Sequence, residues 1–390
     1  MTLLQPPPLS LYIHIPWCIR KCPYCDFNSR AIKGDPDENA CVDALLADLD
    51  TELPQVRGRT LHSVFIGGGT PSLLSGAAVE RLLAGVRQRM PCPSGMEITL
   101  EANPGALASE RFGPYRAAGI NRLSIGVQSF DAGCLQRLGR IHGPGEAIAA
   151  VEAARAAGFD NINLDLMFGL PGQGLDQARM DLDTAAGLGP AHISYYQLTL
   201  EPGTPFFRSP PPLPAEEGIW EMQRQGRIFL QKNGYAQYEV SAYARPGRQC
   251  RHNLNYWTFG DYLGIGAGAH GKISDASGRI MRRWKVAAPE AYLKAAGTGK
   301  ALAGQRRLTH EDIVLEFMMN ALRLHQGFSR SLFEARTGLP FERIQARLDK
   351  AVQRGLLEPG ADGARPSSSG RRFLNDLLAL FLPDGKSPLK

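Results

Sequence analysis

Six short apolar segments recur along the first half of the chain, and each is followed by a segment with helical periodicity. Continuous apolar runs are typical of parallel strands, because helices cover both faces of their sheet. The apolar segments are residues 9–15, 61–66, 97–101, 122–125, 161–166 and 192–198, and the helical ones are 39–53, 76–89, 109–118, 145–157, 175–188 and 216–232. Six such units most readily form a parallel barrel, complete or partial, with a doubly wound sheet as the competing architecture. We predict an α/β fold built on a partial (β/α)6 barrel of the TIM type.

The character of the chain changes after the sixth unit. Four prolines within 210–214 indicate a rigid break, and the glycine-rich segment 263–271 predicts a loop whose backbone passes close to a neighbour. Residues 309–356 then indicate three helices, and 373–381 a last amphipathic helix. We predict four parts, namely a flexible leader at 1–8, the barrel at 9–245, an extension of the barrel at 246–300, and a small, mostly helical domain of winged-helix type at 301–390.

Composition excludes some classes of function. Hydrophobic residues make up 43% of the 390 residues and charged residues 21%, which is typical of a globular protein. No apolar run approaches the roughly 18 to 20 residues that a membrane-spanning helix needs, and no secretion signal opens the chain, so we expect a cytoplasmic protein. The net charge of +6 is spread along the chain, which argues against nucleic acid as a partner but would suit anionic ligands or peripheral contact with an anionic membrane.

Three of the seven cysteines share one short loop directly after the first predicted strand. Cys18, Cys22 and Cys25 cluster there, whereas the other four stand alone at positions 41, 92, 134 and 250. This pattern favours metal binding over disulfides. A cubane closed by protein needs four ligands, so three thiolates predict a [4Fe–4S] cluster with one iron open to an outside ligand. The alternatives are a zinc site with His14 as fourth ligand, or unrelated buried thiols.

Polar residues follow the later predicted strands, at the barrel end where active sites lie. The segment Gly-Gly-Gly-Thr-Pro at 67–71 would let bare backbone approach a ligand, although a tight turn is the simpler explanation. Glu101, Gln128 and Asp165 stand at or just after the ends of three further strands. Charged groups there need partners, and Arg140 is a candidate cation unless it forms a surface salt bridge.

The spacing C-x3-C-x2-C after a first strand resembles the signature of radical S-adenosylmethionine proteins. In that superfamily the amino and carboxylate groups of the methionine moiety bind the open iron, and an electron from the cluster cleaves the sulfonium to a 5′-deoxyadenosyl radical. The glycine-rich segment resembles the motif that holds the methionine amino group. The resemblance therefore implies S-adenosylmethionine as the outside ligand of the cluster.

Longer motifs resemble the branch of the oxygen-independent coproporphyrinogen oxidases over nearly the whole chain. They are Tyr-Ile-His-Ile-Pro-Trp-Cys at 12–18, Gly-Val-Gln-Ser-Phe around Gln128, and Asp165 with the Gly-Leu-Pro that follows. The resemblance implies that S-adenosylmethionine is faced by Tyr12, Gly68, Glu101 and the carbonyl side of Tyr24 and Gly268. It also implies that the neighbouring space, which holds a second cofactor molecule or substrate in the oxidases, is lined by Gly69, Thr70, Gln128, Arg140, Asp165 and Thr199.

Two features set this chain apart from the oxidases themselves. Phe27 stands two positions after Cys25, where the oxidases have a fourth cysteine, and a phenyl ring cannot do thiol chemistry. The cysteines also begin at position 18, so we expect no long amino-terminal extension of the oxidase kind. Both features resemble the HemW group of heme chaperones, as does the motif His-Asn-Leu-Asn-Tyr-Trp at 252–257.

This last motif contains a candidate heme ligand. Imidazole is a usual axial ligand of heme iron, and Tyr or Trp can stack on a porphyrin, so the resemblance implies heme binding by His252. Alternatively, Tyr256 and Trp257 are packing residues and His252 is a hydrogen-bonded structural histidine. The competing candidates for the iron are His142, His270 and Cys250.

The carboxyl-terminal part of the chain resembles the HemW group in one segment and departs from it in another. Residues 373–378 resemble its terminal helix, which favours a HemN-like carboxyl-terminal domain. The preceding Pro-Ser-Ser-Ser-Gly-Arg-Arg at 366–372 departs from the apolar-threonine turn usual there.

Our leading hypothesis is a radical S-adenosylmethionine protein that binds heme and delivers it to heme-accepting respiratory enzymes, as a monomer or homodimer. Delivery is implied by the resemblance alone. The competing hypothesis is an enzyme that decarboxylates coproporphyrinogen III oxidatively, and a third is a radical enzyme acting on an unrelated substrate. Phe27 argues against the second hypothesis.

Overall fold

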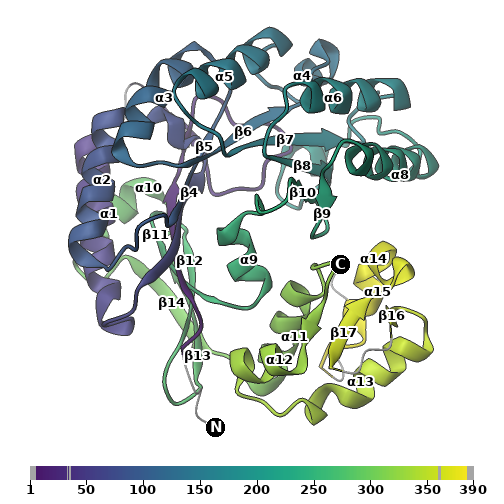
Figure 1. Ribbon diagram of the computed structural model, residues 1–390. Helices are drawn as coiled ribbons and strands as arrows, with labels where there is room; N and C mark the ends of the chain where they lie inside the picture. Colours follow the sequence, from purple (N-terminus) through teal and green to yellow (C-terminus); the bar gives the residue numbers. More distant parts are fainter. Residues whose placement is uncertain (1–5, 33, 35–36, 359–361, 384–390) are drawn as a thin grey trace.

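The parallel part of one large sheet is built from six strands that are each followed by a helix on the outside of the curve (Figure 1). The computed structural model describes residues 6–32, 34, 37–358 and 362–383. The strands are β1 Leu9–Ile15, β4 Leu61–Gly68, β5 Glu97–Ala102, β6 Arg122–Gln128, β7 Ile162–Phe168 and β8 His192–Gln197. The helices are α1 Glu38–Glu52, α2 Gly76–Arg89, α3 Ala106–Ala118, α5 Pro144–Ala156, α6 Leu175–Gly187 and α8 Glu216–Lys232. The predicted partial (β/α)6 barrel is confirmed.

The sheet continues beyond these six strands at both edges. At one edge β11 Asp261–Ile265 pairs in parallel with β1, and three antiparallel strands follow it: β12 His270–Ser274, β13 Ile280–Lys285 and β14 Leu302–Arg307. At the other edge β10 Ala242–Ala244 and β9 Ala236–Gln237 follow β8. The order of the described strands runs from β14 to β9 without returning, so the barrel is open.

The prediction of a loop over 263–271 is wrong at both of its ends. Residues 263–265 complete β11 and residues 270–271 begin β12, so only 266–269 form the connection. The predicted close approach is present, because a Cβ on Gly264 would lie 2.0 Å from the carbonyl oxygen of His270. Glycine at this position allows the backbone of the next strand, β12, to pass close by.

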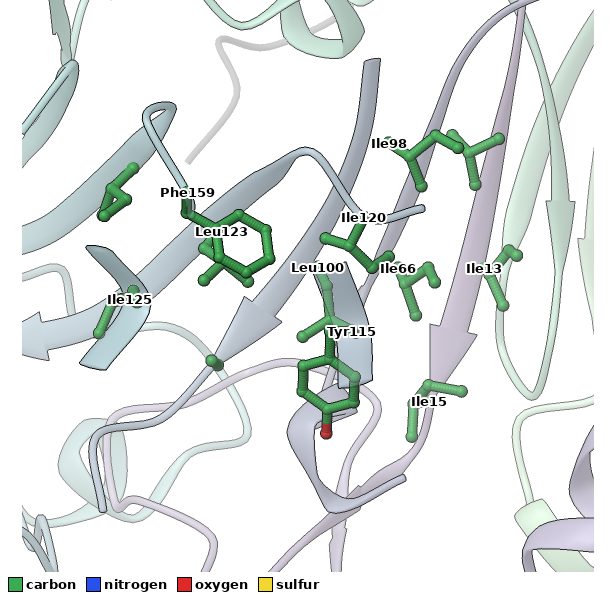
Figure 2. Close-up of a cluster of buried hydrophobic side chains, with 14 of the residues drawn as sticks. Ile13, Ile15, Ile66, Ile98, Leu100, Tyr115, Ile120, Leu123, Ile125 and Phe159 are labelled. Atoms are coloured by element: carbon green, nitrogen blue, oxygen red, sulfur yellow. The ribbon is translucent and has the colours of Figure 1, made fainter. Parts of the chain in front are cut away.

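The main core lies between the strands and the outer helices. Ile13, Ile66, Leu100 and Leu123 come from four neighbouring strands and form a continuous apolar layer (Figure 2). Tyr115 of α3 packs on this layer, and its hydroxyl donates to the carbonyl oxygen of Leu74 at 2.6 Å. Burial on both faces explains why these strands read as apolar runs in the sequence, and it fixes the carboxyl ends of the strands relative to one another.

Shorter elements connect the units. The cysteine loop lies between β2 Trp17–Cys18 and β3 Arg30–Ala31, and the other connections contain α4 Ala132–Arg137, α7 Pro205–Arg208, α9 Arg251–Trp257, α10 Pro289–Ala295 and the 3₁₀ turns Leu53–Gln55 and Pro71–Leu73. Of the predicted leader, residues 1–5 lie outside the described residues. Pro8 accepts a hydrogen bond from the backbone N–H of Asp261 at 2.9 Å, and Pro7 accepts one from Arg59, so the chain is already held to the sheet before β1 begins.

A second hydrophobic core belongs to the carboxyl-terminal part of the chain, which lies at the open side of the barrel (Figure 1). Its elements are α11 His310–Ala321, α12 Arg330–Thr337, α13 Glu342–Gln353, α14 Ser368–Arg372, α15 Leu374–Ala379 and the three-stranded sheet of β15 Phe328–Ser329, β17 Gly363–Pro366 and β16 Leu357–Glu358. Phe317 is central, with ring contacts to Phe259, Phe328 and Phe333. Because Phe259 precedes β11, this core is joined to the large sheet; the exact domain bounds stay predictions.

Across the described part of the chain, every helix is too short or too polar to cross a bilayer.

Candidate cluster and cofactor site

The three clustered cysteines lie in one loop at the carboxyl end of β1. Cys18 ends β2, which pairs with β3, and the backbone N–H of Cys25 donates to the carbonyl oxygen of Cys22 at 3.2 Å. Lys21 Nζ closes the loop by donating to the carbonyl oxygen of Phe27 at 2.9 Å. All three thiols are free of disulfides, and all three line one cavity of about 410 Å³, which we call the cluster cavity.

The zinc alternative does not fit these surroundings. Within the described residues, no three Cys, His, Asp or Glu side chains converge as a single metal ion would require. His14, the candidate fourth ligand, uses both ring nitrogens, because Nδ1 is 3.0 Å from the hydroxyl of Tyr12 and Nε2 is 2.9 Å from the carbonyl oxygen of Asn28. Three unpaired thiols around one cavity are instead the donor set of a cluster held by three protein ligands.

The glycine segment after β4 packs directly against the start of the cysteine loop. A Cβ on Gly69 would lie 2.4 Å from the carbonyl oxygen of Trp17, and Gly68 has a φ of 113°. The N–H groups of Gly69 and Thr70 donate to Ile15 and Trp17 at 2.7 Å, and that of Gly68 donates to Glu101 at 3.0 Å. Because these backbone donors are used, the backbone of residues 68–70 can offer a ligand only its carbonyl oxygens, which suit an amino group.

Two carboxyl groups line the cluster cavity. Glu101 is the last residue but one of β5, whereas Asp165 lies in the middle of β7, so its predicted position at a strand end is wrong. Burial, and next the charge of Asp165, raise the pKa of Glu101 to about 8. Burial also raises the pKa of Asp165, although Asn163 and Ser124 donate to it at 2.9 and 3.0 Å. Two buried carboxyls that repel each other form a site that a cationic group would stabilise.

The raised pKa of Glu101 predicts a pH dependence of stability. A carboxyl whose pKa is raised by folding favours the folded state below its unfolded pKa, and this contribution is lost as the pH rises through about 8. Between about pH 5.5 and 7.5 we expect the wild type to lose about 1 to 3 kcal/mol relative to Glu101→Gln, which cannot ionise. Urea unfolding of both proteins without cofactors measures the difference. Parallel pH profiles of the two proteins would contradict the assignment.

Arg140 connects the cysteine loop to the strand ends. Its Nη2 donates to Asn103 Oδ1 and to the carbonyl oxygen of Gly126, both at 2.8 Å, and its Nη1 lies 3.7 Å from Cys22 Sγ. It is therefore not a surface ion pair, and its guanidinium lies directly beside the cysteine loop. Gln128 ends β6 at a shift in strand register with a φ of 69°, and it accepts a hydrogen bond from Tyr196 at 2.7 Å.

Nine of the eleven side chains and glycines implied for S-adenosylmethionine and its neighbourhood line the cluster cavity together. These nine are Tyr24, Gly68, Gly69, Thr70, Glu101, Gln128, Arg140, Asp165 and Thr199. The sequence did not single out Asn103, which also donates from Nδ2 to Thr70 Oγ1 at 2.9 Å, nor Tyr196. Asn103 follows Glu101 by two residues, and this position at a strand end was the available signal.

The other two, Tyr12 and Gly268, line a second cavity of about 550 Å³, which we call the aromatic cavity. Its walls include Tyr256, Trp257, Tyr262 and Phe259. Gly268 has a φ of 75°, and a Cβ there would lie 2.4 Å from Asn28 Nδ2, which donates to the carbonyl oxygens of Ala267 and Ala287. The structure thus separates these two residues from the other nine. Phe27 lines both cavities.

His252 is buried beneath the aromatic cavity and is not open to an iron. Its Nδ1 lies 2.9 Å from Ser63 Oγ and its Nε2 lies 3.0 Å from the hydroxyl of Tyr256. The structure therefore contradicts His252 as an accessible ligand and agrees with a structural histidine that orients Tyr256.

The three competing candidates for the heme ligand differ in whether their side chains are exposed. His142 is buried, with Nε2 bonded at 3.0 Å to the carbonyl oxygen of Val127, and Cys250 is buried against Glu97. His270 is exposed at the edge of the aromatic cavity, where it stacks on Trp284 with ring centroids 6.5 Å apart. Partial enclosure of the ring at that edge, and then the charge of Arg282, lower the pKa of His270, which favours the neutral imidazole.

Comparisons with known proteins agree with this architecture. The Radical SAM superfamily matches residues 12–185, and the HemN C-terminal domain matches residues 308–373. Heme chaperone HemW of Escherichia coli is 50% identical over 98% of this chain and 100% of its own length, and that of Bacillus subtilis is 34% identical over 96% and 99%. The structure of coproporphyrinogen III oxidase (HemN) from Escherichia coli, a radical SAM enzyme, superposes with a TM-score of 0.82 at 25% identity, covering 96% of this chain and 90% of that one.

The barrel, its cysteine loop and the carboxyl-terminal domain thus define a radical S-adenosylmethionine protein of the HemN type. Within this class, the chain is up to 50% identical to HemW proteins over nearly its full length. The chain belongs to the HemW family.

Proposed function

We propose that this chain is a heme chaperone, which binds heme together with a [4Fe–4S] cluster and S-adenosylmethionine and delivers the heme to respiratory acceptor proteins in the cytoplasm or at the membrane surface. Its relatives named heme chaperones match nearly its full length. The observation that carries the proposal is the aromatic cavity, which adjoins the cluster cavity through Phe27.

Cys18, Cys22 and Cys25 would hold the cluster. The carbonyl oxygens of the glycine segment and Glu101 would receive the amino group of S-adenosylmethionine, and Arg140 would offset the negative charge near Cys22. A bound cluster would supply one-electron chemistry for cleavage of a sulfonium. The side chains of this chain orient the cofactor and exclude water, because the cavity floor is lined by buried groups.

The aromatic cavity has the size and chemistry that a porphyrin needs. Its volume of about 550 Å³ lies within the range of roughly 300 to 1,000 Å³ that is typical of ligand pockets. Tyr256 and Tyr262 pack edge to face at 4.5 Å, and such rings provide flat apolar walls. Arg282 is the cation positioned for a propionate, although Glu316 now accepts from it at 2.7 Å. We propose His270 as the iron ligand, because its imidazole is neutral and accessible.

The test is a hemin titration of the reconstituted protein without oxygen. We expect a stoichiometric complex with a shifted Soret band, and in His270→Ala a loss of the ligand-specific band with binding at least about tenfold weaker, since one coordinate bond is removed. His310→Ala, which changes an exposed histidine at the start of α11, is the matched control and should bind as the wild type does. An unchanged spectrum in His270→Ala would refute this ligand, and no Soret shift in the wild type would refute heme binding.

The enzyme hypothesis is decided by turnover. Incubation with coproporphyrinogen III, S-adenosylmethionine and a reductant should yield no protoporphyrinogen, because Phe27 stands where the oxidases have a thiol and its ring is 54% exposed at the junction of the cavities. Product at catalytic yield would overturn the chaperone proposal.

A further inference from the structure

A third cavity lies between the barrel and the carboxyl-terminal domain, on the side where α14 approaches α8 and β9 (Figure 1). It holds about 70 Å³ and we call it the arginine cleft. Its lining residues include five arginines, Arg224, Arg227, Arg323, Arg371 and Arg372, together with His325. Neither the fold nor the proposed function accounts for this concentration of positive charge. Two of the arginines, Arg371 and Arg372, lie in the segment 366–372.

Only two of these arginines have acidic partners. Arg224 pairs with Glu221 at 2.6 Å, and Arg323 pairs with Glu239 at 3.0 Å. Within the described part of the chain the structure gives no ion pair for the other three. Arg227 has no hydrogen bond there either, while Arg372 stacks on Trp220 with its guanidinium carbon 4.0 Å from the ring centroid.

Arg371 is the most constrained of the three. Its Nη1 donates to the carbonyl oxygen of Pro366 at 3.0 Å, and its Nε is buried without a partner. Burial, and next the charge of Arg227, lower the pKa of Arg371, although Glu358 acts in the opposite direction. Burial, and next the charges of Arg371 and Arg227, lower the pKa of His325 to about 4. Arginines contributed by α8 and by α14 therefore face each other across the cleft at an electrostatic cost, and the neighbouring histidine stays neutral.

We propose that the arginine cleft binds an oxyanion, a phosphate or a phosphate ester, between the barrel and the carboxyl-terminal domain. The planar guanidinium donates two parallel hydrogen bonds to such a group, and an anion between Arg227 and Arg371 removes their mutual repulsion. The volume of about 70 Å³ suits one tetrahedral group, since a water occupies about 30 Å³ and a whole nucleotide would need a much larger pocket.

The phosphate can come from two sources. One is a soluble phosphate compound, and the other is a phospholipid headgroup, for which the exposed Ile228 and Phe373 beside the arginines would supply apolar contacts. The two sources share their chemistry at the cleft and differ in what surrounds it. The arginine cleft and the aromatic cavity share no lining residue, although Arg323 of the cleft packs on Trp257 of the aromatic cavity, with its guanidinium carbon 4.3 Å from the ring centroid.

The experiment uses the full chain and the double variant Arg227→Gln/Arg371→Gln. The control is Arg57→Gln/Arg354→Gln, which removes the same charge from two exposed sites. Inorganic phosphate is titrated against the proteins at constant ionic strength with chloride as the balancing anion, with calorimetry and melting temperature as readouts. We expect phosphate to raise the melting temperature of the wild type and control, and binding at least about tenfold weaker in the cleft variant, because two charge-assisted contacts are lost. In chloride alone the cleft variant should melt no lower than the wild type, since a repulsion is removed.

Co-sedimentation with phosphatidylglycerol vesicles, and with phosphatidylcholine vesicles as the neutral reference, distinguishes the sources. A lipid headgroup is the ligand if the wild type binds the anionic vesicles, if inorganic phosphate displaces it from them, and if the cleft variant does not bind them. Weaker phosphate binding in the variant with unchanged vesicle binding supports the site with a soluble ligand. If the variant matches the wild type in both assays, or if the wild type binds neither partner, the proposal is wrong.

Discussion

Replacing Cys18, Cys22 and Cys25 together by alanine is expected to abolish the brown chromophore and to lower bound iron from about four atoms per chain to nearly none. The three thiols are the only cysteines that line the cluster cavity among the described residues. A cluster with three protein ligands cannot be retained when all three are removed. Iron analysis and the visible spectrum of the protein reconstituted without oxygen measure the result.

The matched control replaces Cys41, Cys92 and Cys134, none of which lines the cluster cavity. Cys41 and Cys134 are buried thiols, so this variant can lose some stability, but we expect its iron content and spectrum to equal those of the wild type. Retention of four irons by the first variant, or loss of iron in the second alone, would refute the assignment of the ligands.

Asp261→Ala is expected to cost about 3 to 5 kcal/mol of the free energy of unfolding, the range for breaking a buried ion pair by removing one partner. Asp261 begins β11 and is fully buried; it accepts from Lys272 Nζ at 2.9 Å, from Arg59 at 2.8 Å and from both the N–H and the hydroxyl of Ser274. Without it, the ammonium of Lys272, which is 1% exposed, has lost its counter-ion in the interior.

Urea unfolding of the variant measures this loss, and Asp183→Ala is the control. Asp183 pairs with Arg179 at 3.1 Å on the exposed face of α6, where an ion pair contributes less than about 1 kcal/mol. Because Lys272 also lines the aromatic cavity, Asp261→Ala should weaken hemin binding while leaving the iron content of the cluster unchanged. A loss of stability equal to that of the control would contradict this account of the pair.

The fold was largely predictable because its strands are buried on both faces. β1 and α8 begin and end where their apolar patterns do, whereas β4, β6 and β7 run two or three residues further than predicted, through Gly68, Gln128 and Phe168. The strand β11 was missed, since Gly264 and Gly266 hide a five-residue strand inside a glycine-rich sequence. A glycine-rich sequence indicates that another backbone passes close by, but it does not indicate whether the glycines themselves lie in a loop or in a strand.

The cluster loop was predictable from spacing alone, because three thiols so close in sequence must lie close in space. The surroundings of His252 were not. A structural histidine and a metal-binding histidine differ in which groups face their ring nitrogens. For His252 one of these groups is Ser63, which lies 189 positions away in the chain, so local sequence gives no sign of it. Likewise, the resemblance implied that Tyr12 faces S-adenosylmethionine, but the sequence carried no information on which of two cavities the ring would line.

The position of Phe27 makes the contents of its two cavities depend on each other. One ring that forms part of both walls cannot move for a guest on one side without changing the space on the other. Suppose that a bound porphyrin changes the affinity of the protein for the sulfonium cofactor by some factor. Thermodynamic linkage then requires that the bound cofactor changes the affinity of the protein for the porphyrin by the same factor. If heme and S-adenosylmethionine occupy these cavities as proposed, Phe27 alone would let the binding of one alter the binding of the other, without a long-range change in the fold.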